Sequence, residues 1–234
     1  SAGLLAAILA FASTLEAQSL DWPRVNNDAG GMRYSQLDQI NRDNVAQLAP
    51  AWTFHTEEVK DGKGRTIECT PIVVDGVMYI TTGYLKLVAL NAGTGKEIWR
   101  FDPLKDHPSR HGLASGGVNR GCAYWSDGKP DGERRIIHGI SDGRLFSLDA
   151  RTGQLDPNFC EGGIRDLRKE LNPEVADLAY GPTSAVAIWK DTIIVGVSTG
   201  EGPEVASPGD IRAFDVRTGA QLWRFHTIPH PGEP

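Results

Sequence analysis

The sequence contains few cysteines and no run of basic residues. Its three cysteines, Cys69, Cys122 and Cys160, are spread over 234 residues, and their spacing matches no zinc or iron–sulfur site. An odd count leaves at least one thiol free or paired outside the chain, and the role we expect for all three is as small buried hydrophobic groups. The 24 basic and 30 acidic residues give a formal charge of −6. Without a cluster of Lys and Arg, this balance argues against a nucleic-acid-binding face.

The sequence also lacks an apolar run long enough to span a bilayer. Residues 4–12 are apolar, but a spanning helix needs about 20 such residues. Together with the Ser-Thr-Leu-Glu-Ala that follows, residues 1–17 fit the apolar region and cleavage end of a secretory signal, or an anchor, whose charged start is missing. The alternative is a short N-terminal helix, amphipathic or buried. The first interpretation predicts an exported protein.

One turn motif recurs three times, at residues 90–95 (LNAGTG), 148–153 (LDARTG) and 214–219 (FDVRTG). Each copy follows a β-rich run, and the final glycines recur at intervals of about 60 residues, a pattern of stacked supersecondary units. Two copies precede a Trp-x-Phe strand, at 99–101 and 223–225, whereas a third Trp-x-Phe, at 52–54, has no such turn before it. The 27 glycines and 14 prolines favour a turn-rich β protein over a helical bundle.

The periodicity predicts four strands in each unit. In the first unit, Asp75-Gly76 between two β-branched runs is a strong hairpin signal. The second unit is expected to carry a loop excursion at 160–171, and a short capped helix is expected at 41–48, with a strand at 51–55. The strands expected in the three units are 71–74, 77–82, 87–90 and 97–101; then 121–125, 135–140 and 144–148; then 183–189, 193–197, 211–214 and 223–225.

These units predict an all-β fold of the β-propeller class, in which radial closure typically takes 4–8 blades. Three blades cannot close, so we expect about three to four blades of a truncated propeller, the N-terminal part of a longer protein. A linear β array is the alternative. Trp99 and Trp223 are expected to pack between neighbouring blades, with Trp52 as a third case.

The repeat L-D/N-A-x-T-G-x-x-x-W resembles the blade motif of quinoprotein dehydrogenases that bind pyrroloquinoline quinone (PQQ). Residues 21–23 (DWP), 33–35 (RYS) and 48–52 (LAPAW) resemble the N-terminus of the glucose-dehydrogenase-like branch, and 118–125 (VNRGCAYW) resembles a family strand. The likeness covers nearly everything from Asp21 onward and includes 225–233 (FHTIPHPGE). It implies that residues 18–234 are the N-terminal part of an eight-bladed propeller with PQQ in a central pocket.

The resemblance also implies a set of cofactor residues. Arg120 matches an arginine that reaches a PQQ carboxylate, a task that suits the guanidinium fork; a surface ion pair is the alternative. Glu68 matches a glutamate that contacts the cofactor, and its alternative is a solvated acid at a strand entry. Thr183 matches a threonine that donates to a PQQ carboxylate, although threonine is common in strands.

A further segment, Ser198-Thr199-Gly200-Glu201, matches a family Ser-Gly-Ala-Glu stretch. The resemblance implies that Ser198, Thr199 and Gly200 touch the cofactor and that Glu201 binds calcium, for which a carboxylate is the appropriate ligand. This chain has Thr-Gly in place of the family's Gly-Ala, so the resemblance does not assign the floor of the pocket. Glu204 competes for the metal role, and a loop acid without metal is the other alternative.

Two expectations concern what the chain does not supply. Alcohol-oxidising members carry two adjacent cysteines where this chain has Ala114 and Ser115, so the resemblance shifts the expected substrate toward sugars or polyols. The family's aspartate base, its remaining calcium ligand and its tryptophan floor are expected beyond Pro234, so no catalytic residue is assigned here. Six histidines at no shared spacing favour solvated or structural roles.

The function implied is that of a PQQ- and Ca²⁺-dependent oxidoreductase of the periplasm. It would oxidise a sugar or alcohol and pass electrons to ubiquinone or a cytochrome c, with membrane association left open and the present chain alone incomplete and inactive. The alternative is a non-catalytic propeller that shares the repeat and serves as an assembly or binding scaffold. Such a scaffold has no need for Arg120 and Glu201 together on inner strands, which favours the enzyme.

Overall fold

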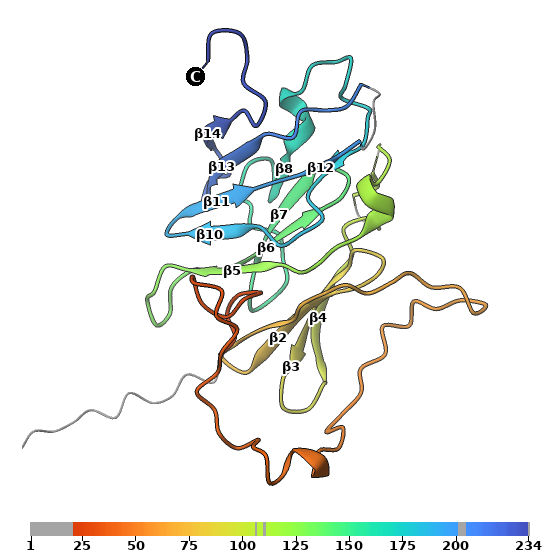
Figure 1. The fold of residues 1–234 in the computed structure, drawn as a ribbon, viewed down its shortest axis with the longest axis vertical. Coiled ribbons are helices and arrows are strands. Elements are labelled where there is room, and N and C mark those ends of the chain that lie inside the picture. The colour runs from red at the N-terminus through yellow and green to blue at the C-terminus, as the bar shows by residue number, and fades with distance from the viewer. Residues whose placement is uncertain (1–20, 106, 110, 201–204, 234) are drawn as a thin grey trace, which may run out of the picture.

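The computed structural model describes residues 21–105, 107–109, 111–200 and 205–233. Within them the chain forms three four-stranded antiparallel sheets and one two-stranded sheet, and the four-stranded sheets follow one another in chain order (Figure 1). The signal-like segment 1–17 lies outside the described residues. In the part of the chain that is described, each helix is too short or too polar to cross a membrane.

Each four-stranded sheet is one blade and matches one predicted repeat unit. In the first blade, Asp75 (φ 51°) and Gly76 (φ 74°) form the tight turn between the first two strands, as the sequence predicted. The strands of the three blades are β1 (Ile72–Val74), β2 (Val77–Thr81), β3 (Leu87–Asn91) and β4 (Glu97–Phe101); β5 (Ala123–Ser126), β6 (Arg134–Ile140), β7 (Arg144–Asp149) and β8 (Ile164–Asp166); and β10 (Ala187–Trp189), β11 (Thr192–Val195), β13 (Ile211–Asp215) and β14 (Gln221–Phe225). The small sheet pairs β9 (Tyr180–Gly181) with β12 (Ser198–Thr199).

Three local expectations were wrong. Residues 160–171 are not a loop excursion, because Gly162 and Gly163 turn the chain at positive φ and β8 then pairs with β7, followed by the 3₁₀ helix η3 (Leu167–Glu170). The helix expected at 41–48 is a single 3₁₀ turn, η1 (Val45–Gln47); Val45 is exposed, and so short a helix is not stable without packing. Residues 51–55 form no strand ladder with any described residue.

The recurring turn has one geometry in all three blades. In the first, Asn91 Oδ1 accepts from the backbone N–H groups of Gly93 and Thr94 and from the Thr94 hydroxyl, at 2.9–3.1 Å. Asp149 and Asp215 accept the corresponding three hydrogen bonds in the other two turns. The glycine that closes each turn has φ of 69–70°, which side chains disfavour. The motif is therefore a side-chain-capped turn that a few local residues define.

Tryptophan side chains join neighbouring blades through these turns. Trp99 of β4 packs against Gly153, and its indole N–H donates to Ala150 O at 3.0 Å in the turn of the next blade. Trp52 packs in the same way against Gly95 and donates to Ala92 O at 3.0 Å. The prediction that these tryptophans pack between repeats is confirmed for Trp99, and Trp52 follows the same rule.

The third turn is held differently, because the fourth strand of the second blade has no tryptophan. Cys160 and Phe159 pack against Gly219 in place of an indole. The buried guanidinium of Arg135 donates to Val216 O at 2.8 Å, the acceptor that corresponds to Ala92 and Ala150, and pairs with Asp156 at 2.7 Å. Trp223 is 44% exposed and meets no corresponding turn among the described residues.

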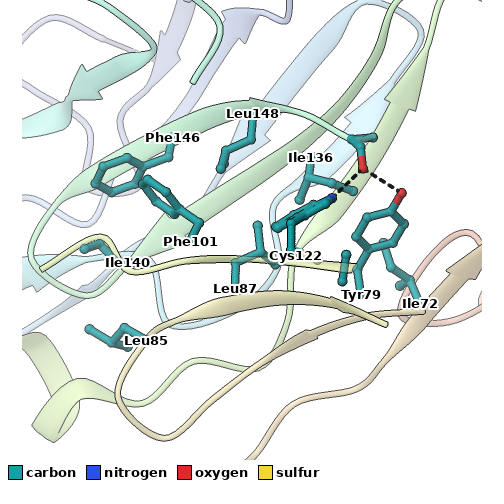
Figure 2. Packing of buried hydrophobic residues seen from close by; sticks show 13 residues of the cluster. Ile72, Tyr79, Leu85, Leu87, Phe101, Cys122, Ile136, Ile140, Phe146 and Leu148 are labelled. Atoms are coloured by element: carbon teal, nitrogen blue, oxygen red, sulfur yellow. Dashed lines mark hydrogen bonds between the residues drawn. The ribbon is translucent and has the colours of Figure 1, made fainter. Parts of the chain in front are cut away.

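Two hydrophobic clusters lie between successive blades. The first lies between the first two blades, where Leu87 and Phe101 meet Phe146 and Leu148 (Figure 2), with the rings of Phe101 and Phe146 5.3 Å apart. In the same view, the Tyr79 hydroxyl donates to Ala150 O at 3.2 Å. The second lies between the second and third blades.

The three cysteines, all of them described, carry free thiols. Cys122 is buried, as expected for a small hydrophobic group, whereas Cys69 and Cys160 are partly exposed. Burial raises the pKa of the Cys122 thiol well above its ordinary value, which favours the unreactive thiol form.

Candidate functional site

Three segments that enter the first strands of successive blades lie side by side. Backbone hydrogen bonds join them: Thr70 N donates to Arg120 O at 3.2 Å, and Arg120 N donates to Thr183 O at 3.0 Å. The segments lead into β1, β5 and β10. Residues that are 50 or more positions apart in the sequence therefore form one continuous wall, because equivalent strands of neighbouring blades begin at the same end of the propeller.

The Arg120 side chain connects the other two predicted residues of this wall. Its Nη2 lies 3.0 Å from Glu68 Oε2, and its Nη1 donates to Thr183 Oγ1 at 3.2 Å. The side chains of Arg120 and Glu68 are 47% and 35% exposed. The structure thus brings Glu68, Arg120 and Thr183 together, as the prediction of a shared site requires.

This arrangement suits recognition of an anionic, oxygen-rich ligand. A guanidinium has five N–H donors, and the pair of contacts to Glu68 and Thr183 orients it without using all five. Thr183 accepts from Arg120, so its own O–H remains a donor. Glu68 acts on the guanidinium as a positioning partner, since a fixed planar fork loses less entropy when it binds a carboxylate.

A cavity of 240 Å³ opens next to Thr183. Its lining includes three residues with hydroxyl groups, Thr183, Ser184 and Ser198, next to the apolar side chains of Ala185 and Val197. Small-molecule pockets usually have volumes of about 300–1,000 Å³. The described residues therefore form part of a pocket wall.

The predicted Ser198-Thr199-Gly200-Glu201 segment is only partly described. Ser198 and Thr199 form β12 opposite Gly181 and Tyr180, so the small sheet brings them close to the Thr183 segment. Gly200 follows as an exposed residue. The predicted metal ligand Glu201 and its competitor Glu204 lie outside the described residues.

Two contacts near this wall were not predicted from the sequence. The Ser115 hydroxyl lies 2.8 Å from the Ser198 hydroxyl, and Ser115 has a left-handed backbone (φ 47°, ψ 39°). Arg65 packs against Gly117 in the same loop. No sequence signal could have paired Ser115 with Ser198, since 83 residues separate them.

A larger groove of 520 Å³ lies elsewhere, between the first two blades. It is lined by Asp75, Trp99, Tyr124 and Arg134, among others, and none of the predicted site residues contributes to it. In this groove, the indole N–H of Trp99 already donates to Ala150 O. We therefore locate the candidate site at the Arg120 wall.

The histidines occupy different surroundings. His138 is fully buried and its Nε2 lies 2.7 Å from Leu85 O, which is a structural role. His226 and His230 instead stack on each other, with ring centroids 3.9 Å apart. The short spacing between His226 and His230 is visible in the sequence, but no contact between them was predicted from it.

Comparison with known proteins identifies the family to which this fold belongs. The PQQ family model described as "Glucose/ethanol/alcohol dehydrogenase, beta-propeller domain" matches residues 22–234. The chain belongs to this family and forms part of its β-propeller domain.

Curated relatives named as quinoprotein or quinohemoprotein dehydrogenases align with most of the chain. The quinoprotein glucose dehydrogenase of Escherichia coli (strain K12) is 38% identical over 214 residues, which cover 88% of this chain and 27% of that protein. The quinohemoprotein alcohol dehydrogenase of Comamonas testosteroni is 34% identical over 220 residues, with coverage of 93% and 27%. The chain therefore spans about a quarter of the length of these relatives.

Solved structures agree with the fold. The crystal structure of the Comamonas testosteroni enzyme has a TM-score of 0.72 and 33% identity, covering 93% of this chain and 29% of that one. A europium-containing methanol dehydrogenase has a TM-score of 0.65 and 26% identity, covering 91% of this chain and 33% of that one. The all-β, partial-propeller prediction is thereby confirmed.

Proposed function

We propose that the intact protein is a PQQ- and Ca²⁺-dependent dehydrogenase that oxidises a sugar or alcohol in the periplasm. Its electrons would pass to ubiquinone or a cytochrome c, and association with the inner membrane is part of the proposal. The observation that carries it is the contact of Arg120 with both Glu68 and Thr183 on the wall where the blades begin. The membership of the family and the names of the relatives support the oxidoreductase class.

The donor set of the wall fits PQQ, which is a flat ortho-quinone with three carboxylates. Arg120 would bind one carboxylate through its free donors, and the Thr183 O–H would donate to the same group or its neighbour. Ser198 adds a hydroxyl beside the cavity, and its bond to Ser115 limits its rotation. When bound, PQQ supplies a two-electron acceptor whose quinone carbonyl a divalent cation polarises.

The protein's part in the reaction would be to bind and orient. Glu68 would hold the guanidinium of Arg120 in a fixed orientation on the wall, so that the cofactor meets a preorganised charge. Glu201 is proposed as a calcium ligand, with Thr199 and Gly200 in contact with the cofactor. The absence of the adjacent cysteine pair at Ala114 and Ser115 favours a sugar or polyol as substrate.

Titration of the intact apo-protein with PQQ at saturating Ca²⁺ tests this proposal. Arg120→Ala should weaken PQQ binding by roughly tenfold to a hundredfold, because a charged hydrogen-bond donor contributes about 1.5–3 kcal/mol. Arg42→Ala is the matched control, since Arg42 is exposed on the N-terminal segment. Equal PQQ affinity in Arg120→Ala, Arg42→Ala and the parent would contradict the assigned wall.

A second titration separates the metal role from the cofactor role. Glu201→Gln removes charge while it keeps shape, so it should raise the Ca²⁺ concentration needed for activity and leave PQQ affinity at saturating Ca²⁺ nearly unchanged. The same titration is also made with europium in place of Ca²⁺, because one similar structure contains europium. Failure of the parent to bind PQQ under any of these conditions would favour the non-catalytic scaffold.

A further inference from the structure

Two imidazoles and a carboxylate converge in the loop that follows β14. His226, His230 and Glu233 each offer one ligand atom, and these atoms all lie within 4.8 Å of one another. His226 Nδ1 is 2.8 and 2.9 Å from the two carboxylate oxygens of Glu233, and the His226 and His230 rings stack at an angle of 12°. Three groups of the kind that bind transition metals thus meet at one point.

The loop holds this arrangement through its own backbone. Glu233 N donates to His230 O at 3.0 Å, and His230 N donates to Glu233 Oε2 at 2.8 Å. Pro229 and Pro231 flank His230 and restrict the chain on both sides, while Gly232 supplies the positive φ of 93°. Binding of an ion would therefore cost little further ordering of the loop.

A buried acid faces the other nitrogen of His226. Asp210 Oδ2 lies 4.0 Å from His226 Nε2, and the Asp210 side chain is 7% exposed. The register of β13 and β14 pairs Ile211 with Phe225, so Asp210 and His226 are the next residues on facing strands. Metal-ligating histidines usually present their second nitrogen to a carboxylate, which fixes the tautomer and raises the basicity of the ligand.

We propose that His226, His230 and Glu233 form a binding site for a divalent transition-metal ion of the Zn²⁺ class. His226 would bind through Nδ1, His230 through one ring nitrogen, Glu233 through a carboxylate oxygen, and water would take the fourth position. Imidazole ligands select such ions over Ca²⁺ and Mg²⁺, which prefer all-oxygen sites. The ion would tie the chain that leaves β14 into a closed loop at the edge of the third blade.

The distances require a modest adjustment. With metal–ligand bonds of about 2.0–2.1 Å, neighbouring ligand atoms in a tetrahedral site lie about 3.3 Å apart. The proton between His226 Nδ1 and Glu233 must leave and their 2.8 Å separation must widen by about half an ångström. Without an ion, a hydrogen bond between His226 and Glu233 holds the loop closed through the same contacts, an arrangement that we call the proton-mediated clasp. The experiment has to distinguish this arrangement from the metal-bound state.

Calorimetric titration of the intact protein with Zn²⁺, in excess Ca²⁺ to fill hard-cation sites, tests the proposal. His230→Gln and His226→Gln should each weaken Zn²⁺ binding by more than about 100-fold, and Asp210→Asn by about tenfold, the range for partners that support a metal ligand. His55→Gln is the matched control, because His55 is exposed and outside the loop. His230 is exposed as well, so its variant keeps the test valid if His226→Gln fails to fold.

Spectroscopy with Co²⁺ as the probe identifies the ligands. The parent and His55→Gln should show the intense visible absorption of four-coordinate Co²⁺, and His230→Gln and Glu233→Gln should lose it. Zn²⁺ binding that is unchanged in His230→Gln, or a parent that binds no Zn²⁺, would overturn the proposal and leave the proton-mediated clasp. Neither result depends on PQQ, so the outcome is independent of the function proposed above.

Discussion

The indole of Trp99 packs so closely on Gly153 that a Cβ at Gly153 would lie 2.5 Å from Trp99 Cε3. The indole N–H also donates to Ala150 O in the same turn. Since Trp99 lies on the last strand of the first blade and Gly153 closes the turn of the second, this single contact links the two blades. It also explains why the turn motif ends in glycine.

Gly153→Ala should therefore destabilise the intact protein by about 2–5 kcal/mol. About 1–2 kcal/mol comes from the left-handed backbone and the rest from displacement of Trp99, since overpacking typically costs 1–3 kcal/mol. Denaturant midpoints provide the measurement. Gly128→Ala is the control, because Gly128 has φ of 76° with open space around it; equal losses in both variants would show that the Trp99 contact contributes nothing.

Trp223 is expected to play the same role toward a blade that follows in the intact protein. Trp52 and Trp99 each pack on the turn of the next blade, so Trp223 should pack on a further turn. Trp223→Ala should then cost about 3–5 kcal/mol in the intact protein. The exposed Trp189 is the control, and its replacement by Ala should change stability by less than about 0.5 kcal/mol. A Trp223→Ala protein with the midpoint of the parent would contradict the rule.

Arg135 should be as important to the third blade as Trp99 is to the second. Arg135→Met removes the buried donor to Val216 O and leaves Asp156 as an unpaired acid that is nearly buried. Breaking a buried ion pair in this way costs about 3–5 kcal/mol. Arg134→Met removes an exposed hydrogen bond to Pro130 O and a distant pairing with exposed Asp75, and it should cost no more than about 1 kcal/mol. Thermal unfolding of the two variants makes the comparison, and similar losses would refute it.

His138 should make stability depend on pH. Burial lowers its pKa from 6.5 to about 4, and its Nδ1 has no partner among the described residues, consistent with a neutral ring that donates from Nε2 to Leu85 O. Between pH 6.5 and about 4 the unfolded chain binds a proton that the folded protein does not. Stability is therefore unaffected above this window and falls as the pH is lowered through it, by about 2 kcal/mol at pH 5.

Denaturant midpoints at pH 7 and pH 5 measure this loss. In His138→Gln, which retains a donor for Leu85 O, the pH-dependent loss should shrink by about that amount. His55→Gln should keep the full pH dependence, because His55 is exposed. An unchanged pH dependence in His138→Gln would show that His138 is protonated in the folded state.

Much of the fold could be predicted from the sequence because its signals are local. The Asx-capped turns at Asn91, Asp149 and Asp215 are made by residues within four positions of one another, and Asp75-Gly76 encodes its own hairpin. The fourth strand of the second blade was missed for the converse reason. β8 has three residues without a hydrophobic pattern, and it is a strand because two glycines turn it onto β7.

In the candidate site, too, the residues could be named from local motifs, whereas their contacts could not be predicted. A resemblance of short motifs was enough to name Glu68, Arg120 and Thr183, yet their contact depends on three blades stacked in register. Ser115 and Ser198 could not be paired in advance, and the stacking of His226 on His230 depends on the turn that ends at Glu233.

The sequence alone determined the repeat, the turn chemistry, the four-stranded unit and the residue types of the wall, since each depends on neighbours along the chain. The tertiary structure decided which blade each tryptophan joins, how Arg135 replaces an indole at the third turn, and which side chains meet Arg120. These depend on contacts between residues 40 or more positions apart, and such contacts form when packing of apolar faces brings the blades together.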